Sequence, residues 1–177
     1  KTKHLDYQFD NVKVFFPKYI NNPLFWYYGR SLWVDLEARA IMSLIDKEHL
    51  HFDLIHAHFT WPSGAVGNKL KEHYSVPIII TEHTSSTFNK AIQTKDAVFI
   101  SAWSNANRII RVRKGDLSAF ENVRIPLNKI VYIPNGYNSE KFYPIDFIEC
   151  KNELNLSKNR KIILNVGNLY SEVKGHY

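Results

Sequence analysis

Cysteine, glycine and long apolar runs are scarce in this sequence, and each scarcity excludes a class of site. The 177 residues contain one cysteine, Cys150, which excludes an intramolecular disulfide framework and a cysteine-rich zinc module and suits a reducing compartment. Seven scattered glycines form no phosphate-binding loop and no dinucleotide fingerprint, and no nucleophile elbow is present. No run approaches the ~18 apolar residues that a membrane span needs.

The overall composition is that of a folded chain. Hydrophobic residues make up 45% and charged residues 23%, and the formal net charge is +6. This balance favours a packed domain over a disordered tail, and the length allows one domain, or one domain and part of another. The chain begins with Lys1, and no charged and then apolar leader follows. We therefore expect part of a longer protein that is located in the cytoplasm.

Short apolar strands alternate with helical segments along the chain. Helix 31–49 is expected to begin at Ser31, which can cap it, and to carry an apolar stripe that includes Trp33 and Ile45. The alternation predicts a doubly wound, mostly parallel α/β sheet of the Rossmann-like kind. Strands are predicted at residues 12–16, 52–56, 77–81, 96–101, 129–133 and 161–166, and helices at 31–49, 62–74, 104–113 and within 151–160.

Polar or conformationally special residues follow four of the predicted strands. They lie in residues 56–64, 81–86, 135–138 and 167–175. In open α/β sheets, ligands collect beyond the carboxyl ends of the strands, where helix N-termini offer free N–H groups. The four segments are therefore expected to share one edge of the sheet, and this convergence predicts a binding site there.

Three histidines in these segments allow more than one interpretation. His56 and His58 could ligate a metal, but two histidines without a third ligand favour one hydrogen-bonded strand-end histidine and one that borders a cleft. His83 precedes three hydroxyl residues, so capping a helix and facing a cleft are equally compatible with its position. Glu82 could act as a base, yet neighbouring residues of a strand point to opposite faces.

Basic and aromatic residues gather in two places. Residues 104–130 hold six basic side chains against two acidic ones, and residues 25–28 are all aromatic. The basic segment could be a solvated helix face, or it could meet an anionic substrate or an anionic membrane surface. The aromatic segment could be core or could touch lipid. Nucleic acid is not expected, because no nucleic-acid-binding motif accompanies the charge.

An ordered series of segments resembles the group 1 glycosyltransferases (family 4), which are retaining enzymes of the two-domain GT-B fold. The resemblance covers roughly residues 50–177 and rests on the order of the segments more than on any one of them. The segments are 52–58 (FDLIHAH), 76–83 (VPIIITEH), 133–144 (IPNGYNSEKFYP) and 166–176 (VGNLYSEVKGH).

The resemblance implies a domain division and a set of substrates. Residues 1–145 would be an incomplete acceptor-side domain, 146–160 a linker, and 161–177 the first strand and loop of a donor-binding domain, with the chain truncated at both ends. The implied reaction is transfer of a hexose from a nucleotide sugar to a polysaccharide or lipid-linked acceptor, with no metal and no other cofactor. The chain alone is then expected to be inactive, since the paired glutamates of the donor-binding domain are not in it.

Site residues follow from the resemblance position by position. His83 would lie near the transferring sugar as the catalytic residue, and Lys174 would neutralise the donor diphosphate. Gly167 and Asn168 would belong to the loop that approaches the phosphates. The remaining implied substrate-binding residues are His58, Thr84, Asn135 and Gly136.

Two alternatives stand beside a transferase. The first is an acceptor-binding domain that never catalyses. The second is a sugar-nucleotide epimerase of GT-B shape, which would need no acceptor.

Overall fold

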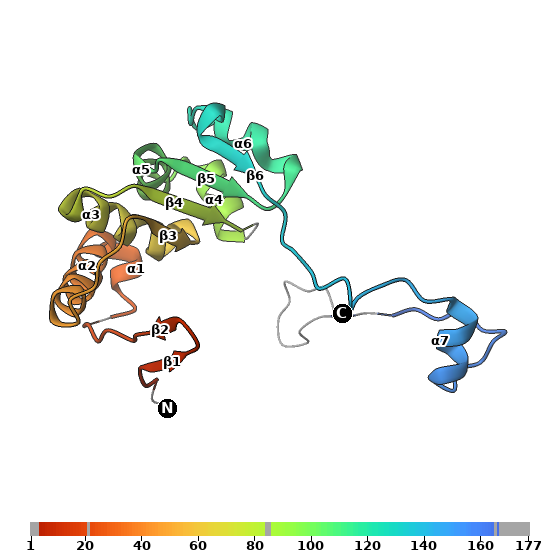
Figure 1. The fold of residues 1–177 in the computed structure, drawn as a ribbon. Helices are drawn as coiled ribbons and strands as arrows, with labels where there is room; N and C mark the ends of the chain where they lie inside the picture. The colour runs from red at the N-terminus through yellow and green to blue at the C-terminus, as the bar shows by residue number, and fades with distance from the viewer. Residues whose placement is uncertain (1–3, 21, 84–85, 165, 167–177) are drawn as a thin grey trace. The chain divides into compact units, whose positions relative to one another are not determined.

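The computed structural model describes residues 4–20, 22–83, 86–164 and 166. Its backbone divides into two units, Lys1–Asn135 and Gly136–Tyr177. The first unit holds the sheet and the candidate site (Figure 1). The second unit is described separately below.

Four parallel strands form the sheet of the first unit. They lie side by side in the order β3-β4-β5-β6, and their register pairs Ala57 with Ile80, Ile80 with Ile109, and Ile109 with Ile130. The strands are β3 (Ile55–His58), β4 (Ile78–Glu82), β5 (Arg108–Arg111) and β6 (Ile130–Tyr132). The structure thus confirms the predicted parallel, Rossmann-like α/β class, which is consistent with the N-terminal domain of a GT-B protein.

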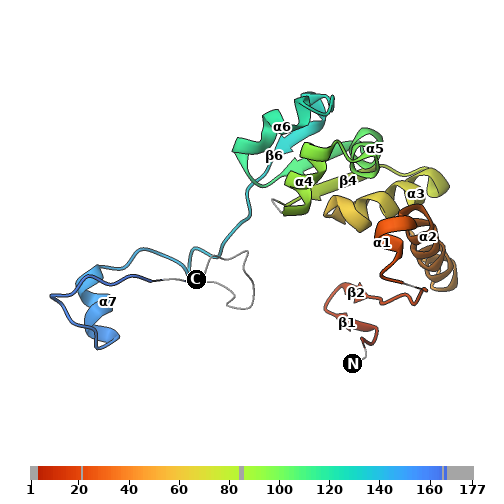
Figure 2. The same cartoon turned by 180° about the vertical axis from the view of Figure 1, so that it is seen from behind.

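Helices pack on the face of the sheet that carries Ile78, Ile80 and Ile109. Phe88, Trp103 and Phe120, from three different helices, join these isoleucines in one buried cluster. Strands stand in front in Figure 1, and α4 and α5 stand in front in the reverse view of Figure 2. The helices are α3 (Ala65–Tyr74), α4 (Ser86–Thr94), α5 (Ala97–Asn105) and α6 (Leu117–Glu121), with one π-type turn at Thr60–Gly64 and 3₁₀ turns at Lys114–Asp116 and Leu127–Lys129.

A long helix packs beside α3 at the β3 edge. Helix α2 (Arg30–Lys47) follows the short helix α1 (Phe25–Tyr28) and a hairpin of β1 (Tyr7–Phe9) and β2 (Val12–Val14). The expected cap is wrong, because Gly29 occupies the N-cap position and no side chain caps the helix. Its buried residues are Val34, Ala38 and Ile45, so Ile45 is buried as expected, whereas Trp33 is only partly buried.

The segment between β4 and β5 corrects two expectations. Residues 96–101 were expected as a strand, but α5 covers them, because the Asp96 carboxylate accepts hydrogen bonds from the N–H groups of Val98 and Phe99. Residues 104–113 were expected as a helix, but β5 lies there, between β4 and β6. The cap at Asp96 favoured a helix after it, and the position of residues 108–111 between two strands favoured a strand there. Both effects outweighed the local residue pattern, since secondary-structure propensity is a weak guide where tertiary packing decides.

The second unit contains one helix among its described residues, α7 (Phe147–Glu153). Asp146 caps it by accepting the N–H groups of Ile148 and Glu149, so it begins before the helix expected within 151–160. The strand expected at 161–166 is not formed in the described part of that segment, and Ile163 is 96% exposed there. A strand needs a hydrogen-bonded neighbour, and the described residues pair none with it.

Replacing Gly67 by alanine is expected to lower the free energy of unfolding by about 1–3 kcal/mol through overpacking. A Cβ there would lie 2.5 Å from the Cδ1 of Ile78, which is fully buried, so the side chain of Ile78 or helix α3 would have to shift. Urea unfolding measures the loss. Gly115→Ala is the matched control, because the nearest atom to its new Cβ is 3.9 Å away. Equal effects of the two substitutions would contradict the close packing of α3 on β4.

In the part of the chain that the structure describes, no helix is both long enough and apolar enough to cross a membrane.

Candidate functional site

Two predicted site residues meet at the carboxyl ends of neighbouring strands. His58 ends β3 and His83 directly follows β4, and His58 Nδ1 lies 3.1 Å from His83 Nε2. Their rings stack with centroids 5.4 Å apart, and the Phe59 ring lies 4.8 Å from that of His83. The parallel pairing of β3 with β4 places both histidines on one edge and on one face of the sheet. The convergence predicted for these two residues is confirmed.

His56 has a different role from His58. Its Nε2 lies 2.7 Å from the Oγ1 of Thr81, two residues after its register partner Ile79 on β4. This is the hydrogen-bonded histidine that the sequence predicts. The cleft expected beside the other histidine, His58, stays a prediction. No group of three His, Cys, Asp or Glu side chains in the described residues is arranged to hold a metal ion.

Two of these histidines have a lowered pKa. Partial burial lowers the pKa of His83 below its ordinary value of 6.5, and the nearby charges of His58 and Arg111 lower it further. Burial and then His58 lower the pKa of His56 in the same way. Both rings are therefore neutral at pH 7, and a neutral imidazole offers one N–H donor and one acceptor nitrogen. Such a ring can hydrogen-bond a sugar hydroxyl from either side.

The histidines make a testable contribution to stability against acid. A pKa that is lower in the folded chain contributes stability above pH 6.5, and this stability is lost as the pH falls through the folded pKa. We expect the free energy of unfolding to fall between pH 7 and pH 5, and to fall less in the double variant His56→Gln, His83→Gln. Urea unfolding at both pH values measures the difference. Parallel profiles of the two proteins would contradict the lowered values.

A buried polar network lies behind the strand ends. The Glu82 carboxylate accepts hydrogen bonds from the backbone N–H and the hydroxyl of Thr60, and Trp103 Nε1 donates to Thr60 Oγ1 over 2.6 Å. Arg111 Nη1 donates to the backbone oxygen of Glu82 over 2.7 Å. The side chain of Glu82 points away from that of His83, as the alternation predicts. The network ties the segment after β3 to β4 and β5 and so holds the histidine edge in place.

Burial dominates the electrostatics of Glu82. Desolvation raises the pKa of its carboxyl, although hydrogen bonds from Thr60 and the charge of Arg111 act in the opposite direction. The guanidinium of Arg111 lies 4.1 Å from the centre of the Phe88 ring, within the core. Sequence reasoning missed Arg111, Thr60 and Trp103. A signal existed only for Glu82, whose place on the Ile78 and Ile80 face predicts a buried charge in need of partners.

The other predicted site residues are less informative. Asn135 and Gly136 follow β6 in an exposed segment, and a Cβ on Gly136 would meet nothing within 4 Å. They stay predictions. Four further residues lie outside the described residues, namely Thr84, Gly167, Asn168 and Lys174.

The basic segment does not form one charged surface. Arg111 is fully buried, and Lys129 donates through Nζ to the backbone oxygen of Ala106 over 3.1 Å. The interpretation as one solvated helix face is wrong for the predicted helix 104–113, because β5 lies within it. The structure therefore leaves a weaker patch than the sequence indicated.

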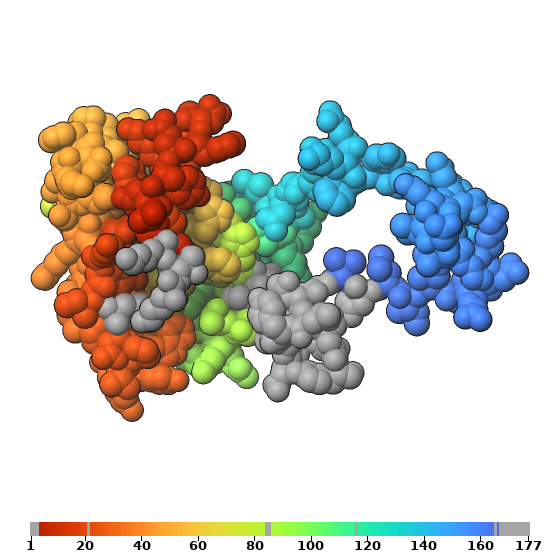
Figure 3. Space-filling model, turned by 90° about the horizontal axis from the view of Figure 1, so that it is seen from below, coloured from red at the N-terminus to blue at the C-terminus, as the bar shows by residue number. Residues whose placement is uncertain are grey.

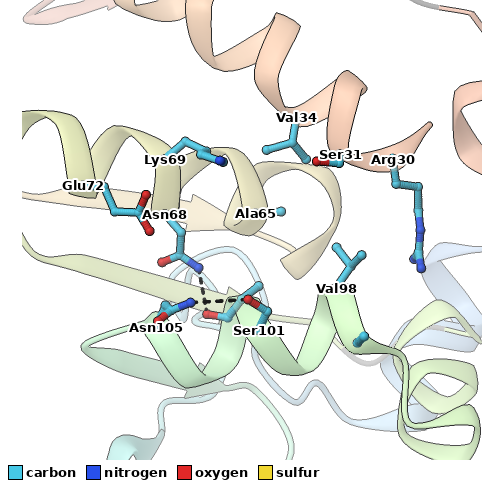
Figure 4. Close-up of a pocket in the computed structure, with 12 residues that line it drawn as sticks. Arg30, Ser31, Val34, Ala65, Asn68, Lys69, Glu72, Val98, Ser101 and Asn105 are labelled. Atoms are coloured by element: carbon cyan, nitrogen blue, oxygen red, sulfur yellow. Dashed lines mark hydrogen bonds between the residues drawn. The ribbon is translucent and has the colours of Figure 1, made fainter.

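Figure 4 shows a groove of about 350 Å³ that lies among α2, α3 and α5. Asn68 in its wall donates to the backbone oxygen of Ala102 over 3.0 Å, which ties α3 to α5. Neither His58 nor His83 lines this groove. The groove is thus separate from the strand-end site.

The fold is a Rossmann-like α/β domain with two histidines side by side at the carboxyl ends of its strands. The family model described as Glycosyltransferase Family 4 matches residues 3–141. The chain therefore belongs to this family, which confirms the resemblance seen in the sequence.

Three relatives illustrate the range of similarity. An uncharacterised glycosyltransferase of Methanocaldococcus jannaschii is 35% identical over 103 residues, which are 57% of this chain and 28% of that protein. The teichuronic acid biosynthesis glycosyltransferase TuaC of Bacillus subtilis is 26% identical over 81% of this chain and 38% of its own length. A D-inositol 3-phosphate glycosyltransferase of Mycobacterium marinum is 22% identical over 67% of this chain and 28% of its own length. The chain thus spans about a third of the length of the curated relatives it matches.

Proposed function

We propose that this chain is the acceptor-side part of a retaining glycosyltransferase that moves a hexose from a UDP- or GDP-sugar to a polysaccharide or lipid-linked acceptor. Family membership supports transferase activity. The names of two relatives support a product that contains sugar or a phosphorylated polyol. The observation that carries the proposal is the contact between His58 and His83 at the ends of two parallel strands. No metal and no other cofactor is part of it.

Within this proposal, His83 meets the transferring sugar. Its lowered pKa keeps the ring neutral at pH 7, so it can donate or accept a hydrogen bond without placing a positive charge beside the sugar. His58 holds one ring nitrogen of His83, which leaves the other for a hydroxyl. The diphosphate that leaves the donor would be neutralised by Lys174, with Gly167 and Asn168 beside it.

The test compares the chain with a full-length protein that carries it. The chain alone, incubated with UDP- and GDP-sugars and a glycan acceptor, is expected to give no transfer, while the full-length protein transfers sugar. Product is measured by mass spectrometry. Robust transfer by the chain alone would overturn the assignment to an acceptor-side part, and no transfer by the full-length protein with any donor would overturn the transferase.

The same assay separates the two alternatives. A sugar-nucleotide epimerase would convert the donor in the absence of acceptor, whereas a transferase forms its glycosidic product only when acceptor is present. A non-catalytic domain would bind the acceptor and leave the donor unchanged in every mixture.

We propose a cytoplasmic location and, separately, contact of the basic segment 104–130 and the aromatic segment at α1 with an anionic membrane. The buried Arg111 removes part of the basic patch on which that contact relied. Vesicle binding at low salt, where surface attraction is least screened, tests it. The absence of binding there would remove membrane contact from the proposal.

A further inference from the structure

Helices α1 and α2 lie in the orange region of Figure 3. Aromatic side chains from these two helices line an open trough. The trough has a volume of about 530 Å³, within the range of small-molecule sites, and is lined by Pro23, Trp26, Tyr27 and Trp33. Tyr27 is 74% exposed and Trp26 is 37% exposed. Aromatic rings that gather on a surface in this way indicate a binding site more often than chance exposure does.

The two tryptophans of the trough are held in place before any ligand arrives. Trp26 and Trp33 each meet the ring of Trp61 edge to face, with centroids 5.7 and 5.6 Å apart. Trp33 Nε1 donates to Glu37 Oε2 over 3.0 Å and lies 3.3 Å from Tyr19 Oη. A rigid aromatic wall loses little conformational entropy when a ligand stacks on it.

The polar groups beside the trough favour a sugar over a lipid chain. A pyranose ring has an apolar face of C–H groups and a rim of hydroxyls, so it can stack on an indole or phenol while its rim forms hydrogen bonds. The hollow that shares Trp26 and Tyr27 with the trough has Lys90, Thr94 and Asp96 among its walls, and polar side chains of this kind can bind such a rim. An acyl chain laid over a carboxylate would remove its water and offer no hydrogen bond in return.

A second hollow lies on the other side of the same helix. It measures about 250 Å³ and shares Trp26 and Tyr27 with the trough, but its other walls include Lys90, Thr94 and Asp96. The rings of α1 therefore form a ridge between an apolar and a polar hollow. Two consecutive units of a glycan chain could occupy the two sides.

The trough is connected through the backbone to the strand-end site. Trp61, which supports both tryptophans of the trough, is the third residue after His58, and Phe59 between them contacts the ring of His83. We propose that the trough binds a pyranose ring of the glycan acceptor, stacked on Trp26 and Tyr27. That the bound glycan is the acceptor rests on the proposed function, whereas saccharide binding by the trough does not.

The experiment titrates the 177-residue chain with neutral hexasaccharides of glucose, mannose and N-acetylglucosamine and follows the tryptophan indole N–H signals by NMR. At least one hexasaccharide is expected to shift the signals of Trp26 and Trp33 in a saturable way and to leave that of the fully buried Trp103 unchanged. Tyr27→Ala is expected to weaken binding by about tenfold, the loss of one stacking residue at a binding site.

Tyr28→Ala is the matched control. This neighbouring ring is 90% exposed and does not line the trough, so binding is expected to stay within about twofold of the unchanged chain. Equal losses in the two variants would overturn the trough, as would no saturable shift with any of the three sugars. Binding to phosphatidylglycerol vesicles that depends on Tyr27, without sugar binding, would overturn it in favour of a membrane surface.

The transferase proposal and the trough proposal can be contradicted independently of each other. If the full-length protein transfers sugar and Tyr27→Ala leaves the acceptor KM unchanged, the trough is wrong and the transferase stands. If the chain binds hexasaccharide through Tyr27 and the full-length protein transfers nothing, the transferase is wrong and the trough stands.

Discussion

Replacing His83 by alanine in the full-length protein is expected to lower kcat for sugar transfer by about 10²–10³-fold, the usual loss for one positioned hydrogen-bonding group at a reacting centre. The reason is the position of its neutral ring, 3.1 Å from His58 at the ends of β3 and β4. Steady-state kinetics with saturating donor measure the effect, and thermal unfolding checks that the fold is retained. An unchanged kcat would contradict any role of His83 in transfer.

His58→Ala separates positioning from general damage. Without His58, His83 loses its ring partner, and a charge that lowers its pKa is removed. We expect a smaller loss of kcat, about tenfold, together with a shift of the acid limb of the kcat profile to higher pH. A loss without that shift would mean that His58 matters only for the fold.

Replacing Glu82 by alanine is expected to lower the free energy of unfolding by about 3–5 kcal/mol, as when one partner of a buried charged network is removed. The Thr60 N–H would lose its acceptor, and the charge of Arg111, fully buried in the core, would lose the carboxylate opposite it on the neighbouring strand. Urea unfolding measures the loss. Glu72→Ala on the exposed side of α3 is the control, with a change within about 0.5 kcal/mol.

Glu82→Gln tests the electrostatics of the same position. Since burial raises the folded pKa of this carboxyl above 4.5, its contribution to stability is present below pH 4.5 and is lost as the pH rises through the folded pKa. The glutamine variant cannot ionise, so we expect its stability to lose less between pH 5 and pH 8 than that of the unchanged chain. An identical slope in both proteins would contradict the raised pKa.

Local sequence patterns predicted strand β4, which leads to the site, but assigned the wrong structure to residues 96–113 that follow it. The apolar run before Glu82 and the polar residues after it predicted β4 and its end within one residue. The run from Ala97 to Trp103 is equally apolar, yet it forms α5, because Asp96 caps a helix and Phe99 and Trp103 pack into the core. Periodicity in such short apolar runs does not separate a strand from a buried helix.

The same limit explains the residues that were missed. Arg111 looked like a surface residue in a basic helix, and its burial followed only from the place of β5 between two strands and from the rings of Phe88 and Phe120 around it. Trp26 and Tyr27 were open to both a core and a surface interpretation. Their exposure depends on how α1 rests on α2 and Trp61, which no pattern within residues 25–28 encodes.

The α/β class, the family and the convergence of the two histidine-bearing strand ends could be predicted from the sequence, because the alternation of segments and the order of motifs are read directly along the chain. The burial of charges, the helix at residues 97–105 and the exposure of the aromatic rings became clear only from the packed structure. Those outcomes depend on contacts between residues far apart in the chain, such as Glu82 with Thr60 and Trp26 with Trp61. These contacts stabilise the fold only once the sheet has brought the residues together, so no local pattern predicts them.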